Sequence, residues 1–104
     1  MSFPFFVNGK MKGWLDLQTE DNGLLPTVIV KNCLNDFIAT HTPDTCEILE
    51  QEGERMHKVM IHFNNEQLRK LKRMAKTWKT NRTNLITTAI YTLINESNNT
   101  KEQL

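Results

Sequence analysis

The fold is decided by the stretch from Lys58 to Ile94, which begins Lys58-Val59-Met60-Ile61-His62-Phe63. Every second residue from Val59 to Phe63 is apolar and would face a core, whereas Lys58, Met60 and His62 would face outward. This alternation predicts a β-strand with one buried face. Because a lone strand leaves its backbone groups unpaired, we expect it to pair with the same strand of a second chain.

Two amphipathic helices are predicted after this strand. Asn64 or Asn65 can cap the first helix, and apolar residues then recur at spacings of three and four. Residues 80–83 interrupt that pattern, and a continuous apolar helical face begins at Leu85. We expect the apolar residues of the strand and both helices to form a dimer core: Val59, Ile61, Phe63, Leu68, Leu71, Ala75, Trp78, Leu85, Ile86, Ala89, Ile90, Leu93 and Ile94.

The strand–helix–helix pattern resembles the ribbon-helix-helix family, the MetJ/Arc-type DNA-binding proteins. The resemblance rests on residues 59–68, on Ala75 and on residues 81–86, within a stretch of about 40 residues. The chain departs from the family at one point: the connection between the helices usually contains a glycine, and here Lys79 or Thr80 occupies that place.

The resemblance implies a homodimer whose two antiparallel strands enter the major groove of DNA. Lys58 can donate to guanine O6 and N7, Met60 can contact a thymine methyl group, and His62 can donate to a base or a phosphate. The resemblance also places a DNA phosphate at the start of the second helix, where we expect Thr83 to be the N-cap. The predicted DNA-binding residues are Lys58, Met60, His62, Lys79, Asn81, Arg82, Thr83 and Asn84. The alternative is an edge strand with a solvated basic face.

Charge is divided unevenly along the chain. Residues 1–54 carry three Lys against nine Asp and Glu, a net of −6, and residues 55–104 carry ten Lys and Arg against three acids, a net of +7. Basic residues cluster on the first predicted helix, at Arg69, Lys70, Lys72, Arg73 and Lys76. Such asymmetry between halves is typical of a nucleic-acid face on one module and a separate role for the other.

The N-terminal half is expected to be a small acidic α+β module, a hairpin plus a helix. Asn8-Gly9 is a preferred two-residue turn, so we expect residues 3–17 to form a β-hairpin, with Gly13 marking a bulge. A helix is predicted from Pro26 to about Thr40, although the β-branched residues 28–30 also allow a strand. We therefore expect an α+β fold with an N-terminal module over 1–54, a ribbon-helix-helix module over 55–97 and a flexible tail over 98–104. No internal repeat is visible, and residues 50–54 are the predicted linker.

Enzymatic and metal chemistry are not indicated. Cys33, His41, Cys46 and His57 do not follow the paired spacings of zinc sites, and no nucleophile triad or phosphate-binding loop is present. We expect no enzyme activity and no cofactor. Two cysteines without a disulfide framework, no signal peptide and no membrane-spanning run predict a cytoplasmic protein with reduced thiols and no membrane partner.

The leading functional hypothesis is a dimeric transcriptional repressor that binds double-stranded DNA, of phage or plasmid type, possessing an acidic module that binds a ligand, a protein partner or further subunits. A second hypothesis keeps DNA binding and changes the task to plasmid segregation, a conjugation accessory role or an antitoxin. A third, from another class, is a phage-type inhibitor that acts by protein–protein interaction, with the basic module as a dimeriser.

Overall fold

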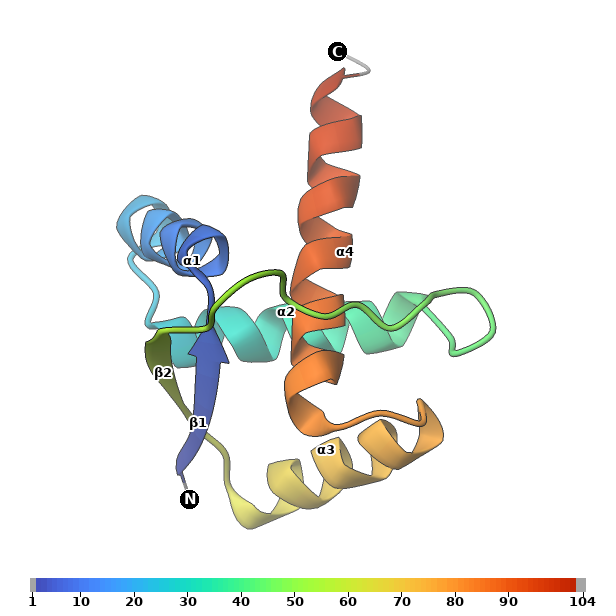
Figure 1. The fold of residues 1–104 in the computed structure, drawn as a ribbon. Coiled ribbons are helices and arrows are strands. Elements are labelled where there is room, and N and C mark those ends of the chain that lie inside the picture. The colour runs from blue at the N-terminus through green and yellow to red at the C-terminus, as the bar shows by residue number, and fades with distance from the viewer. Residues whose placement is uncertain (1, 103–104) are drawn as a thin grey trace.

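The computed structural model describes the backbone of residues 2–102 and the side chains of residues 2–96. Its elements follow the order β1 (Ser2–Val7), α1 (Gly9–Asn22), α2 (Pro26–Thr40), β2 (His57–His62), α3 (Asn65–Thr77) and α4 (Arg82–Glu102). The fold is therefore α+β, and a strand followed by two helices occurs twice along the chain (Figure 1). The predicted tail is largely helical, because α4 continues to Glu102; residues 103–104 lie outside the described part.

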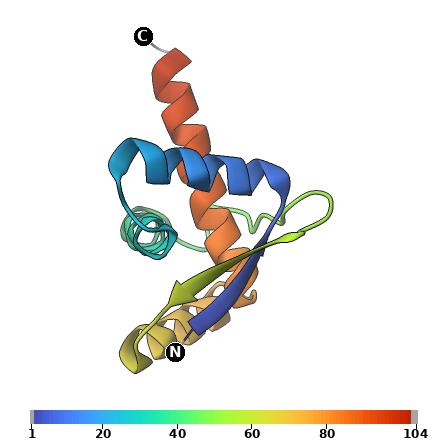
Figure 2. The ribbon, with the colours of Figure 1, turned by 90° about the vertical axis from the view of Figure 1, so that its left-hand side faces the viewer.

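The two strands form one antiparallel ribbon. β1 pairs with β2 in a register that places Phe5 opposite Val59 and Phe3 opposite Ile61. The expectation that β2 pairs with the same strand of a second chain is therefore wrong, since β1 of the same chain supplies the missing strand. Figure 2 shows the ribbon in front of α4, on the side of the molecule that faces the viewer.

The predicted N-terminal hairpin is also wrong. Asn8 caps α1 instead of turning the chain: its Oδ1 accepts from the Met11 N–H at 2.8 Å. Met11 and Leu15 are four residues apart and both buried, so the apolar period after Asn8 is helical. Gly13 lies inside this helix and marks no bulge, and Gly23, at φ 66°, ends the helix in the left-handed conformation that glycine adopts without strain.

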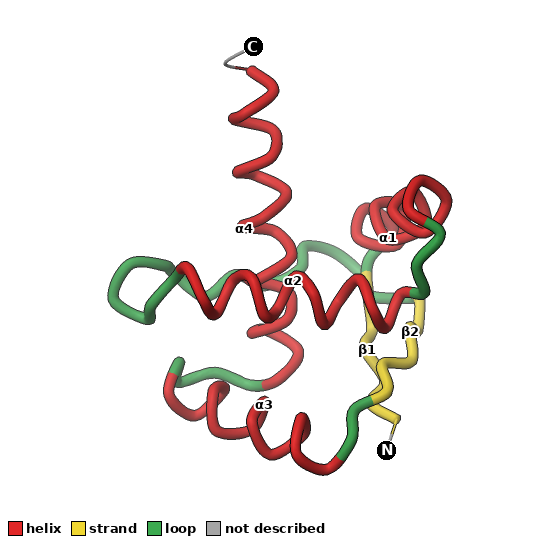
Figure 3. The backbone as a smooth tube through the Cα atoms, turned by 180° about the vertical axis from the view of Figure 1, so that it is seen from behind, coloured by secondary structure: helices red, strands yellow, loops and turns green. Residues whose placement is uncertain are grey.

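The helix predicted from Pro26 to Thr40 is confirmed as α2. Pro26 occupies its first turn, and one face buries four residues, Ile29, Val30, Leu34 and Phe37. Because helical spacing aligns these residues, the β-branched run of residues 28–30 packs within a helix despite its strand propensity. Seen from behind, α2 crosses α4, and the loop that follows α2 returns across the molecule (Figure 3).

The predicted pair of helices after β2 is confirmed, with one correction, at the N-cap of α4. Asn64 caps α3 in a capping box with Gln67. Of the two residues expected at the usual glycine position, Lys79 has the left-handed conformation, with φ 55°, and the Thr80 N–H donates to the Ala75 carbonyl, as in a glycine-type helix end. The cap of α4 is Asn81 rather than Thr83, because Asn81 Oδ1 accepts from the Asn84 N–H at 2.8 Å.

One hydrophobic cluster joins both halves of the chain. It contains Phe5, Met11 and Phe37 from the N-terminal half, and the Phe37 ring lies 5.1 Å from the Trp78 ring between centroids. Residues predicted for a dimer core are buried inside the single chain, apart from Leu93 and Ile94, which are half-buried. Those buried within it are Val59, Ile61, Phe63, Leu68, Leu71, Ala75, Trp78, Leu85, Ile86, Ala89 and Ile90.

The predicted linker is tied to both halves by hydrogen bonds. Gln51 accepts from the Asn8 N–H at 2.7 Å through Oε1, and its Nε2 donates to the Phe6 carbonyl at 2.9 Å. Asn8 Nδ2 donates to the Glu52 carbonyl and to the Tyr91 hydroxyl. This network fastens the segment between α2 and β2 to the ribbon and to α4.

Candidate nucleic-acid interface

The outward face of β2 carries the side chains that the strand period predicted. Lys58, Met60 and His62 are exposed, and the residues between them are buried against the core. This arrangement follows from the pleat of the strand, in which successive side chains point to opposite faces. The face is open to solvent within the single chain.

The same face has a second row of residues that the sequence did not assign to it. The antiparallel register places Ser2 opposite His62, Pro4 opposite Met60 and Phe6 opposite Lys58. All three β1 residues are exposed, and Phe6 retains 46% of its accessible surface. The two rows differ in chemistry, because one holds two ionisable side chains and the other a proline, a phenylalanine and a serine.

The pair Ser2 and His62 is joined by a hydrogen bond. Ser2 Oγ lies 2.8 Å from His62 Nδ1, so the serine holds the orientation of the imidazole ring. When Ser2 donates to Nδ1, the proton of a neutral ring resides on Nε2, which can then donate to a further acceptor. With that tautomer, the outward face of the ribbon presents a donor at His62 Nε2 and a flexible cation at Lys58.

The predicted phosphate site at the start of α4 has fewer free donors than expected. The Asn84 N–H already donates to Asn81, and Asn84 Nδ2 lies 3.4 Å from Glu50 Oε1. The Arg82 guanidinium carbon lies 4.8 Å from the centroid of the Phe3 ring, and Thr83 is half-buried. The Glu50 carboxylate beside Asn84 disfavours an anion at this point, and phosphate binding by residues 81–84 stays a prediction.

The cationic surface of the C-terminal half lies on α3 and the turn after it. Its basic residues are all exposed, and Glu66 in the first turn is the one acid of the helix. The chain passes directly from β2 into α3, so this positive helix begins beside one end of the ribbon. The exposed basic residues are Arg69, Lys70, Lys72, Arg73, Lys76 and Lys79.

Within residues 2–96, no group of three or more His, Cys, Asp or Glu side chains is placed to hold a metal ion. Burial, followed by the nearby Asp36 carboxylate, raises the pKa of Cys33 to about 11, which keeps this thiol protonated at neutral pH. No helix in the described part of the chain is long and apolar enough to cross a membrane.

Comparisons of the chain with protein-family models, with curated proteins and with solved structures gave no match. Function is therefore inferred from the geometry of the ribbon and its surroundings.

Proposed function

We propose that the protein binds double-stranded DNA through the outward face of the β1–β2 ribbon and acts as a transcriptional repressor. In this proposal the protein is of the ribbon-helix-helix type, with both strand–helix–helix halves supplied by one chain. The observation that carries the proposal is the solvent-exposed ribbon, whose Lys58, Met60 and His62 project away from the core. Two other observations support the proposal. The second helices of the two halves, α2 and α4, pack against each other, and the C-terminal half is positively charged.

The ribbon offers a direct reading of base edges. A two-stranded ribbon fits the major groove, where Lys58 can donate to guanine O6 and N7, and Nε2 of His62 can donate to a base or a phosphate. Met60 and Phe6 are exposed apolar groups that suit the thymine methyl group. Exposed lysines and arginines of α3 can neutralise flanking phosphates, which makes affinity depend on salt.

A single-chain ribbon predicts an asymmetric DNA site. In a ribbon made by two identical chains, each outward side chain occurs twice, and the site is palindromic. Here Lys58 faces Phe6 and His62 faces Ser2 across the ribbon, so the two strands offer different groups to the two half-sites. We therefore expect one half-site to be read by hydrogen-bond donors and the other mainly by apolar contact.

Selection from a random DNA library, with the purified full chain, tests the proposal. Binding of the selected and a scrambled duplex is then measured at two salt concentrations for Lys58→Ala and His62→Ala, with Lys10→Ala on α1 as the matched charge control. Each ribbon variant should lower the preference for the selected duplex by roughly 1 to 3 kcal/mol, and the control should leave that preference unchanged. An unchanged preference in both ribbon variants would refute base reading by this face.

A homodimer, or a larger assembly on DNA, remains part of the proposal, although the ribbon does not require a second chain. Sedimentation of the free protein and of the DNA complex gives the number of chains in each state.

A protein-binding role is the second candidate, because the ribbon face also exposes Phe6 and Met60, at 46% and 39% of their accessible surface. Apolar side chains of this size are typical of contacts between proteins. The library selection separates the two functions. A DNA-binding ribbon yields an enriched sequence whose affinity falls steeply with salt, whereas a ribbon that binds only proteins yields no enrichment.

A further inference from the structure

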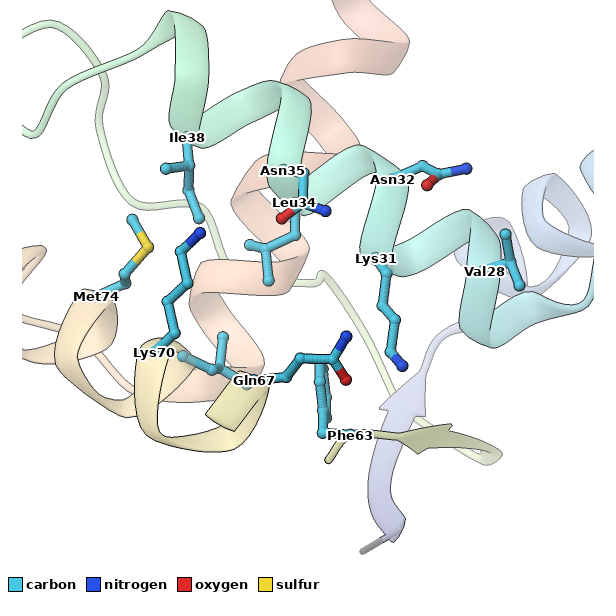
Figure 4. Close-up of a pocket in the computed structure, with 11 residues that line it drawn as sticks. Val28, Lys31, Asn32, Leu34, Asn35, Ile38, Phe63, Gln67, Lys70 and Met74 are labelled. Carbon is cyan, nitrogen blue, oxygen red and sulfur yellow. The ribbon is translucent and has the colours of Figure 1, made fainter. Parts of the chain in front are cut away.

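A groove between α2 and α3 lies outside the ribbon face. It encloses about 260 Å³ and is lined by residues of α2, by Phe63 at the end of β2 and by one side of α3. Figure 4 shows Lys31 reaching into this space from α2 and Lys70 reaching into it from α3. The groove is therefore formed by segments from the two halves of the chain.

The floor of the groove is apolar. Leu34, Phe63 and Leu71 line it and are almost fully buried, with 6%, 4% and 2% of their surfaces exposed. Ile38 and Met74 extend the apolar lining towards the C-terminal ends of the two helices (Figure 4). A floor of this kind favours a ligand that has a hydrocarbon body.

The polar rim of the groove consists of cations and amides. Lys31 and Lys70 are its ionisable groups, and neither forms an ion pair within the described part of the chain. Lys31 Nζ lies 5.4 Å from the centroid of the Phe63 ring. Gln67 Oε1 accepts a hydrogen bond from the Asn64 N–H, so the NH2 of the Gln67 side-chain amide remains to donate. Donors without a carboxylate beside them suit an anionic head group.

We propose that this groove binds a small organic anion with an apolar body, namely a medium-chain monocarboxylate. Lys31 and Lys70 enter the groove from opposite helices (Figure 4), and their flexible side chains close on the carboxylate, while the hydrocarbon chain covers Leu34 and Leu71. A volume of about 260 Å³ exceeds the roughly 150 Å³ of an apolar cavity that holds benzene, and so suits a ligand of about the size of octanoate. This inference is independent of DNA binding by the ribbon.

Titration of the full chain with octanoate, followed by methyl NMR and calorimetry, tests the proposal. Octanoate should shift the methyl signals of Leu34 and Leu71. Octylammonium, which has the same tail and the opposite charge, and inorganic phosphate, which lacks the tail, should each bind at least about tenfold more weakly, because a charge-assisted contact and the apolar floor are both needed.

The lysines are then tested one at a time. Lys31→Gln and Lys70→Gln should each weaken octanoate binding by roughly tenfold. Lys72→Gln removes the same charge from α3 outside the groove and should leave affinity within about twofold, which sets the size of the general electrostatic effect. Three results would each overturn the proposal: octylammonium binding as tightly as octanoate, octanoate binding that neither groove variant changes, or no methyl shift at about 10 mM octanoate. That concentration lies far above the dissociation constant expected for such a contact.

Discussion

The intrachain ribbon predicts that truncating two adjacent phenylalanines of β1 to alanine will have very different effects on the stability of the fold. Phe5 is fully buried opposite Val59, and Phe6 points to the other face with 46% of its surface exposed. Truncating a buried phenylalanine costs about 3 to 5 kcal/mol, whereas truncating an exposed one costs well under about 1 kcal/mol. We therefore expect Phe5→Ala to remove a large part of the stability of a chain whose total is of the order of 5 to 15 kcal/mol, and Phe6→Ala to leave it nearly unchanged.

Urea unfolding followed through the fluorescence of buried Trp78 measures this difference. With a slope of about 1.3 kcal/mol per M for a domain of this size, Phe5→Ala should lower the midpoint by roughly 2 to 4 M. If that variant does not fold, Phe5→Leu should show a smaller loss of about 1 kcal/mol. Equal midpoints for the two alanine variants would show that β1 is not the strand that completes the ribbon.

Three further predictions concern single positions. Asn8→Ala removes the cap of α1 and the donor to Glu52 and Tyr91, so thermal unfolding should show a loss of roughly 2 to 4 kcal/mol, whereas Asn22→Ala at the exposed end of the same helix should cost under about 0.5 kcal/mol. Lys79→Gly relieves a left-handed residue and should stabilise the protein by roughly 0.5 to 1 kcal/mol in chemical unfolding, while Lys76→Gly inside α3 should destabilise it by about 1 kcal/mol. Because the pKa of Cys33 is raised to about 11, iodoacetamide at pH 8 should alkylate it about 100-fold more slowly in the folded than in the unfolded chain. The stability that the protonated thiol contributes should be lost as pH rises from 9 towards 11.

Part of the candidate site could be read from the sequence. The alternation around Ile61 identified Lys58, Met60 and His62 as outward residues, and the pleat of β2 confirms that exposure. Ser2, Pro4 and Phe6 were missed because their place on the same face depends on a strand pairing across more than fifty residues. The N-cap of α4 was placed two residues too late, although asparagine is a stronger capping residue than threonine, and this preference was the available signal for Asn81.

The sequence by itself determined the helices that follow β2, the helix from Pro26, the inward and outward faces of β2 and the separation of charge between the halves. Each of these follows from side-chain periodicity or composition, which are local properties. The tertiary structure alone decided that β1 completes the ribbon and that the supposed dimer core is buried within one chain. A local pattern shows which face of an element must leave water. It does not show which surface will cover that face, because the hydrophobic effect is non-directional and any apolar surface of suitable shape removes the same area from solvent.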